Sequence, residues 1–162
     1  MKLSEIKNFN FTDYIGKGAL LTVKAPSGIL NTMTVSWGTS GVLWNKEVAT
    51  VFVRPQRYTY EFCEETEIFT LSFFGEERKS TLSYCGTKTG RDVDKFKECD
   101  LKYELKNDAC IFEDAKVTFV LKKLYSQDLK IECFNDTEPL KNYKENDFHR
   151  AYTCEIIDVI TK

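Results

Sequence analysis

Short segments with a strand-like pattern follow one another along the chain, mostly without a long helix between them, and this limits the folds open to it. Residues 31–37 alternate strictly between an apolar face and a face that carries hydroxyl groups. The two faces are Met33, Val35 and Trp37, and Thr32, Thr34 and Ser36. Residues 48–53 are almost wholly apolar, which is typical of a strand covered on both sides.

Further strands are predicted at 17–25, 68–74, 116–124 and 149–160. Because glycine weakens a strand, Gly38 and Gly41 are expected to end the 31–37 strand. Residues 129–134 are expected to pair with 116–124 across a turn at 126–128, and the polar stretch 135–147 is typical of a loop.

Short helices are predicted at 57–65, 76–84 and 92–98, the last with Asp92 as its N-cap. The pattern therefore predicts roughly six or seven strands with two or three short helices. Since successive strands mostly lack a long crossover helix, we expect a mainly β, antiparallel barrel rather than a doubly wound sheet. At 162 residues, the chain is expected to form a single domain, 1–162.

Charge and hydropathy exclude two classes of partner. The net charge is −2, whereas a nucleic-acid-binding domain usually has a basic excess, so we expect no nucleic acid. No apolar run approaches the ~18 residues of a transmembrane helix, and the charged N-terminus lacks the pattern of a signal peptide. We therefore expect no membrane association and a cytoplasmic location.

The cysteines and the histidine favour neither a metal site nor acid–base catalysis. The 6 cysteines include no Cys-x-x-Cys pair, so they are interpreted as reduced thiols, mostly buried. His149 is the only histidine, and no nucleophile motif accompanies it. We predict no metal and no catalytic residue of the nucleophile or acid–base type.

Three stretches carry groups that suit a polar ligand. The hydroxyl row of residues 32–36 could hydrogen-bond a polar ring system, but it is also typical of the solvent-facing side of a half-buried strand. Arg54 to Thr59 place two arginines where a buried strand passes into a helix, as in an anion site or a capped surface turn. Residues 84–95 crowd glycines, threonines and basic side chains into one loop but lack the P-loop spacing, which excludes nucleotide hydrolysis of that type.

Taken together, Asn31–Gly38, Arg54–Thr59 and Cys85–Lys95 resemble the flavin reductase-like, FMN-binding split-barrel family, and most closely its flavoredoxin branch. The likeness runs from about residue 18 to the last strand, where His149–Ile156 resembles the closing segment of the family. It implies a Greek-key split barrel that forms a homodimer and holds FMN without a covalent bond.

The resemblance also implies roles for particular residues. Those that would contact the isoalloxazine or ribityl part are Asn31, Thr34, Ser36 and Trp37, and the predicted site also includes Met33. Those that would hold the phosphate are Arg54, Arg57, Tyr58 and Thr59. Lys95 would reach the flavin from the loop, and the pocket wall would take in Ser72, Cys85, Gly86 and Thr87.

The expected function is that of an oxidoreductase that takes electrons from NAD(P)H onto flavin and passes them to free flavin or to a redox-protein partner. The chain has no Gly-x-Gly-x-x-Gly fingerprint, so the nicotinamide would have to stack on the flavin itself. Two alternatives remain open: a non-enzymatic FMN electron carrier, and a barrel that binds another ligand or none.

Overall fold

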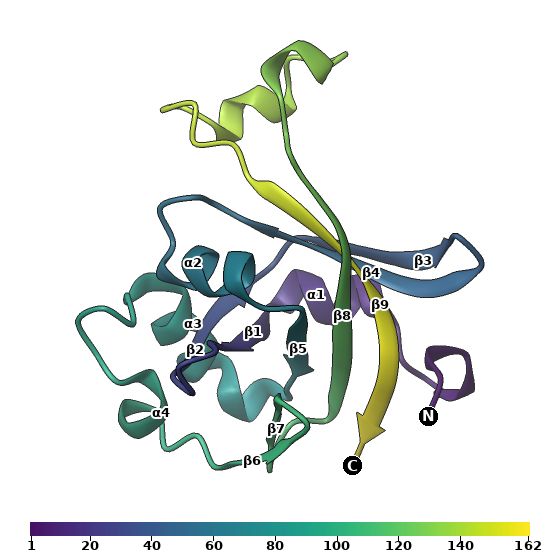
Figure 1. Ribbon diagram of the computed structural model, residues 1–162, viewed down its shortest axis with the longest axis vertical. Coiled ribbons are helices and arrows are strands. Elements are labelled where there is room, and N and C mark those ends of the chain that lie inside the picture. Colours follow the sequence, from purple (N-terminus) through teal and green to yellow (C-terminus); the bar gives the residue numbers. More distant parts are fainter.

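A curved, seven-stranded antiparallel sheet forms the centre of the computed structural model, which describes residues 1–162 (Figure 1). Its order is β2-β1-β5-β8-β9-β4-β3, and it curls until β2, at one edge, contacts β4 near the other. The strands are β1 (Ala19–Lys24), β2 (Leu30–Val35), β3 (Gly38–Leu43), β4 (Lys46–Val53), β5 (Ile68–Phe73), β8 (Val117–Asp128) and β9 (Arg150–Thr161). The predicted antiparallel barrel is thus confirmed.

Four α-helices and a small hairpin surround the barrel (Figure 1). They are α1 (Phe11–Lys17), α2 (Tyr58–Glu65), α3 (Lys79–Thr87), α4 (Lys95–Glu98), β6 (Tyr103–Lys106) and β7 (Ala109–Phe112), with 3-10 turns at Leu3–Glu5, Glu76–Arg78, Ile131–Cys133 and Pro139–Asn142. The predicted N-cap Asp92 is wrong, because α4 begins later. Asp94 caps it, accepting hydrogen bonds from the N–H groups of Phe96 and Lys97, both at 3.1 Å.

The barrel interior is a cluster of 22 buried residues, most of them from the strands, with Ile15 of α1 and Phe62 and Cys63 of α2. At one end, Phe73 and Phe119 pack edge to face with ring centroids 5.2 Å apart. Phe9 lies 5.2 Å from Phe73, and Phe11 of α1 lies 5.9 Å from it. The N-terminal segment therefore closes the barrel with aromatic rings.

The sequence analysis missed β3, because it expected Gly38 and Gly41 to end a strand. Instead β3 pairs with β4 along its whole length, with Gly38 opposite Val51. A Cβ atom at Gly38 would lie 3.1 Å from the carbonyl oxygen of Thr50, so this glycine serves a close approach of backbones. Trp44 and Asn45 have φ values of 53° and 59°, which suit the tight turn of this hairpin. Helix α1 and the β6–β7 hairpin were missed as well.

The predicted pairing of 129–134 with 116–124 is also wrong. Strand β8 continues to Asp128 and pairs with β9, while residues 131–133 form a 3-10 turn. Residues 129–149, called the arm below, project from the barrel at the end of the long β8–β9 hairpin (Figure 1). At its base, the N–H group of Leu129 donates to the carbonyl oxygen of His149 at 2.9 Å.

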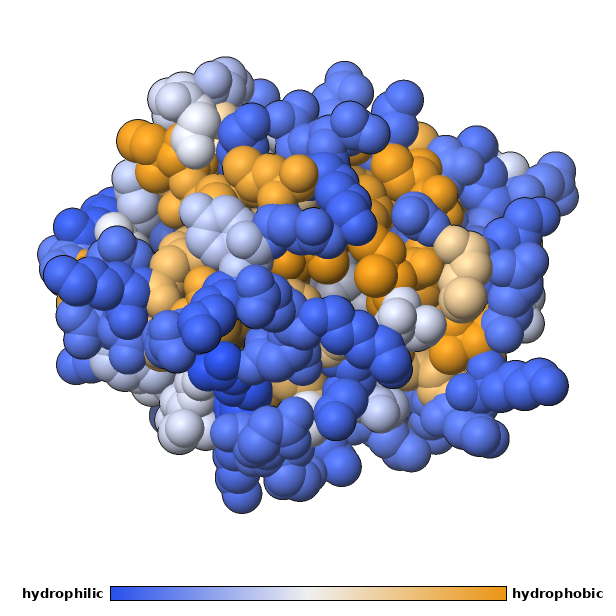
Figure 2. Space-filling view, turned by 90° about the horizontal axis from the view of Figure 1, so that it is seen from below, coloured by the Kyte–Doolittle hydropathy of each residue, from blue (hydrophilic) through white to orange (hydrophobic).

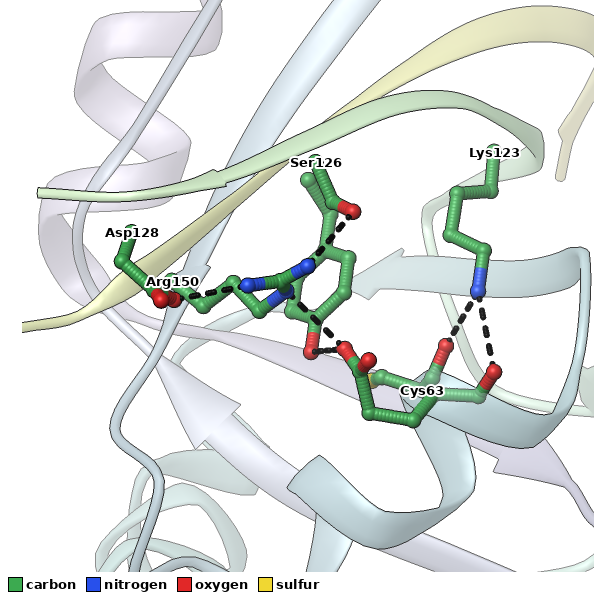
Figure 3. A network of polar contacts seen from close by, with 7 residues as sticks. Cys63, Lys123, Ser126, Asp128 and Arg150 are labelled. Atoms are coloured by element: carbon green, nitrogen blue, oxygen red, sulfur yellow. Dashed lines mark hydrogen bonds and ion pairs between the residues drawn. The ribbon is translucent and has the colours of Figure 1, made fainter.

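A polar network fixes the C-terminal end of α2 against this hairpin (Figure 3). Arg150 donates to Asp128 at 2.8 Å and lies 3.0 Å from a carboxylate oxygen of Glu64, which also accepts a hydrogen bond from Tyr152 at 2.6 Å. Lys123 of β8 donates to the carbonyl oxygen of Cys63 at 2.6 Å. The helix whose first turn carries Tyr58 and Thr59 is thereby held in place.

The outer surface is mixed in character. Figure 2 shows apolar groups lying between polar side chains on the face seen from below. Exposed apolar side chains include those of Val42, Leu43 and Trp44 at the β3–β4 turn. No helix has the length and apolar character needed to cross a membrane.

Candidate functional site

Two pockets that share Arg57 bring together most of the predicted site residues. The first, of about 210 Å³, is called the tryptophan pocket. It is lined by Met33, Thr34, Val35, Ser36, Trp37, Phe52, Arg54, Arg57 and His149. The second, of about 310 Å³, is called the cationic pocket. It is lined by Asn31, Gln56, Arg57, Tyr58, Thr59, Thr87, Lys88, Thr89, Gly90, Arg91 and Lys95.

The predicted hydroxyl row divides between the sheet and the tryptophan pocket. Thr32 is fully buried and bonds the hydroxyl of Thr22 at 2.8 Å. Thr34 lines the pocket and donates to the carbonyl oxygen of Leu82 at 2.6 Å, which ties β2 to α3. Because β2 ends at residue 35, Ser36 and Trp37 leave the alternation of the strand and both line the same pocket.

Arg57 lies between the two pockets, at the N-cap of α2. Its guanidinium donates to the carbonyl oxygens of Gly86 at 3.0 Å and Cys85 at 3.5 Å, both near the end of α3. Burial lowers the pKa of Arg57, but a guanidinium remains charged at neutral pH. The first N–H groups of α2, at Tyr58 and Thr59, have no intrahelical acceptor. This corner therefore presents positive charge and free donors to an anion.

The buried pair of Asn31 and Thr59 forms the floor of the cationic pocket. The side-chain amide of Asn31 donates to the hydroxyl oxygen of Thr59 at 2.8 Å. That hydroxyl keeps its own proton available for another acceptor. Asn31 joins β2 to α2 in this way, and both residues line the pocket.

The structure separates the two arginines that the sequence analysis assigned to one phosphate. Arg54 lines the tryptophan pocket and not the cationic pocket. Its guanidinium bonds the carboxylate of Asp147, donates to the carbonyl oxygen of Asn142 at 2.9 Å and lies 5.1 Å from the ring centre of Tyr143. Arg54 thus anchors the arm beside the tryptophan pocket.

The family model for the flavin reductase like domain matches residues 14–133. The chain belongs to this family. A flavin-related redox function follows from that membership. No curated protein is similar enough to match the chain.

Solved structures agree with this assignment. An FMN-binding protein from Thermus thermophilus, with bound p-hydroxybenzaldehyde, is 20% identical with a TM-score of 0.70, over 100% of this chain and 81% of that one. A flavoredoxin from Methanosarcina acetivorans is also 20% identical with a TM-score of 0.70, over 100% and 76%. An NADH:FAD oxidoreductase from Streptomyces globisporus is 14% identical with a TM-score of 0.68, over 90% and 74%. At such identities the likeness shows the split-barrel fold.

Among the remaining predicted residues of this flavin reductase-like domain, Ser72, Cys85 and Gly86 line neither pocket. Ser72 is fully buried in the sheet, where its hydroxyl bonds that of Thr118 at 3.1 Å. Cys85 is fully buried, and burial raises the pKa of its thiol to about 12, so it is an inert thiol. Only the carbonyl oxygens of Cys85 and Gly86 serve the site, whereas Thr87 lines the cationic pocket.

Lys95 is buried at the base of the cationic pocket rather than extended from the loop. Its ammonium donates to the carbonyl oxygens of Thr32 at 2.8 Å and Cys85 at 3.0 Å, which joins α4 to β2 and α3. Burial is the main reason that the pKa of Lys95 is lowered to about 8; Cys85 and Cys99 raise this pKa, while the charge of Arg57 lowers it. Lys95 therefore changes charge within reach of ordinary buffers.

His149, dismissed at the sequence level, lines the tryptophan pocket. Its Nδ1 atom bonds the hydroxyl of Tyr143 at 2.8 Å, and its ring lies 5.2 Å from that of Trp37. Burial, followed by the charge of Arg54, lowers the pKa of His149 to about 4, so the imidazole is neutral at physiological pH. The sequence signals for this residue were its being the only histidine and its place at the start of the segment His149–Ile156, next to the last strand.

Any ligand that places a phosphate in the cationic pocket is expected to bind roughly tenfold more weakly at pH 9.5 than at pH 7. A phosphate that raises the pKa of Lys95 by about one unit gains about 1.4 kcal/mol from the charged form, and this gain is lost as pH rises past a pKa of about 8. The measurement is the Kd of FMN against that of riboflavin, which lacks the phosphate, in the wild type and in Lys95→Met. An equal fall for riboflavin would contradict the role of Lys95.

Proposed function

We propose that this chain binds FMN and acts as an oxidoreductase that takes electrons from NAD(P)H and passes them to free flavin or to a redox protein. The observation that carries the proposal is the pair of adjoining pockets with different chemistry. One is lined by hydroxyls and aromatic rings, the other by cations and free N–H donors, and Arg57 borders both. FMN likewise joins an aromatic ring to a phosphate through a polyol.

The cationic pocket suits the phosphate. The groups that would hold it are the guanidinium of Arg57, the first N–H groups of α2 and the hydroxyl of Thr59. Lys88 and Arg91 add positive charge from the loop, and Thr87 and Thr89 add hydroxyls. We therefore propose Arg57, Tyr58 and Thr59 as phosphate-binding residues. We do not propose this role for Arg54, because it lines only the tryptophan pocket.

The tryptophan pocket suits the ring end. Thr34 and Ser36 offer hydroxyls, Trp37 offers a flat apolar surface, and the neutral His149 offers one ring nitrogen for a hydrogen bond. When bound, the flavin supplies the two-electron chemistry, while the protein binds and orients it. Because His149 is neutral, it adds no positive charge beside Arg54 at this end of the site.

We also propose a homodimer in a reducing, cytoplasmic setting. The exposed Val42, Leu43 and Trp44 at the β3–β4 turn support a protein contact there. The 6 free cysteines support a reducing compartment. A non-enzymatic electron carrier is the second candidate function, supported by the likeness to a flavoredoxin and by the absence of a dinucleotide fingerprint.

The test is the visible absorbance spectrum of the purified protein after loading with FMN and dialysis, followed by anaerobic addition of NADH or NADPH. We expect retained flavin bands that are nearly stoichiometric with the chain and are bleached within seconds by one nicotinamide. Retained flavin that only dithionite bleaches would establish the carrier instead. No retained flavin, and no rise in melting temperature with excess FMN, would refute both.

A further inference from the structure

We propose that the loop over residues 88–94 is latched to α2 by Arg91, and that this latch selects a flavin mononucleotide over flavin adenine dinucleotide. The inference rests on the proposed function, because it takes the cationic pocket as the phosphate site. The similar solved structures include one described as FMN-binding and one described as an NADH:FAD oxidoreductase, so the fold by itself leaves this choice open.

The loop touches the pocket floor at Gly90. A Cβ atom at this position would lie 2.1 Å from the side-chain oxygen of Asn31 and 3.2 Å from the ring of Tyr58. Both distances are below ordinary contact, so only glycine lets the loop lie this close to β2 and α2. The loop therefore forms a wall of the cationic pocket in direct contact with its floor.

The next residue, Arg91, fastens the loop to α2. Its guanidinium lies 4.7 Å from the ring centre of Tyr58, bonds the carboxylate of Glu61 and donates to the carbonyl oxygen of Gln56 at 3.5 Å. All three partners belong to α2 or to the turn that leads into it. The side chain thus spans from one wall of the pocket to the other.

This position of Arg91 is where a dinucleotide would have to continue outward. Asn31 and Lys95 at the base of the pocket are buried, whereas the lining residues Gln56, Thr87, Lys88 and Arg91 are exposed. A ligand that extends beyond the pocket therefore leaves it past these exposed residues, and Arg91 bridges the loop and α2 there. A monophosphate ends inside the pocket and needs no exit. The second phosphate and the adenosine of FAD would need the space that the Arg91 side chain spans, and would have to break its contacts.

The contacts of Arg91 with Glu61 and Tyr58 are of modest strength, so one substitution is expected to break the latch. Arg91 and Glu61 are 44% and 55% exposed, and exposed pairs are screened by solvent. The stacking on Tyr58 adds a modest attraction. We therefore expect a preference that shifts by about two- to fivefold when the latch is broken, rather than an absolute block.

Glu61→Gln is the deciding variant, because Glu61 does not line the pocket and the charge of Arg91 is retained. We expect the ratio of the Kd values for FAD and FMN, measured by quenching of flavin fluorescence, to fall about two- to fivefold in Glu61→Gln and at least as much in Arg91→Ala. The Kd for FMN should stay within about twofold in Glu61→Gln. Lys141→Ala, which removes a charge from an exposed ion pair in the arm, should leave the ratio unchanged.

An unchanged ratio in Glu61→Gln, with equal losses for both flavins in Arg91→Ala, would make Arg91 a simple phosphate contact and overturn the latch. A wild-type protein that binds FMN no better than FAD would overturn it too. Failure of the wild type to bind either flavin would instead refute the proposed function on which the inference rests.

Discussion

Replacing Arg57 with alanine is expected to weaken FMN binding by about 10- to 100-fold, and to weaken riboflavin binding far less. Hydrogen bonds to charged groups contribute about 1.5–3 kcal/mol each, and 1.4 kcal/mol corresponds to a tenfold change in Kd. Only FMN carries the phosphate that this guanidinium would bind. Arg57 also donates to the carbonyl oxygen of Gly86, and loss of that contact should affect both ligands alike.

Two control variants make this experiment specific. Arg54→Ala removes the arginine that lines the other pocket, so it should change the affinities for FMN and riboflavin by similar factors. Arg57→Lys keeps the charge but loses the planar fork, and we expect an intermediate loss of FMN affinity. Titrations by fluorescence quenching or calorimetry give the Kd values. Equal losses for FMN and riboflavin in Arg57→Ala would show that the cationic pocket does not hold the phosphate.

Replacing Phe73 with alanine is expected to lower the free energy of unfolding by about 3–5 kcal/mol. Phe73 is fully buried, and its ring meets those of Phe9, Phe11, Tyr14 and Phe119 at centroid distances of 5.2–5.9 Å. The substitution removes the ring on which the N-terminal segment packs. Because domains of this size are stable by only about 5–15 kcal/mol, a large part of the stability is lost.

Urea denaturation followed by circular dichroism measures this effect, and the melting temperature should fall by roughly 6–20 °C. Ile157→Ala is a suitable control, since Ile157 is 48% exposed on β9 and its loss should change the free energy by about 0.5 kcal/mol or less. If Phe73→Ala lowered the free energy of unfolding by less than about 1 kcal/mol, the aromatic cluster would not be what closes the barrel.

Much of the fold was predictable because strand patterns are local. The alternation in 31–37 and the apolar run in 48–53 correspond to β2 and β4, and the helix predicted over 57–65 corresponds to α2. The failures have equally definite causes. Strand β3 contains Gly38, which allows a close approach to β4, and this role becomes evident only when the partner strand is known.

The candidate site was predictable in part, and for the same reason. Arg57, Tyr58 and Thr59 are neighbours in the sequence at the start of one helix, so their proximity needed no tertiary information. Ser72 was included from the resemblance alone, and the structure places it inside the sheet, where its hydroxyl is already bonded to Thr118. A hydroxyl residue in a strand looks the same in the sequence whether its side chain faces the interior of the sheet or a pocket.

The sequence by itself determined most of the strands of the barrel, the hydroxyl-bearing strand and the cationic helix start, because each depends on residues close together in the chain. Three placements were decided only by the tertiary structure. Arg54 bonds Asp147, 93 residues away, and buried Lys95 donates to the carbonyl oxygen of Thr32, 63 residues away. His149, at the end of the arm, lies against the ring of Trp37. These placements result from contacts between distant segments, and no local pattern of residues encodes which of two pockets a side chain will enter.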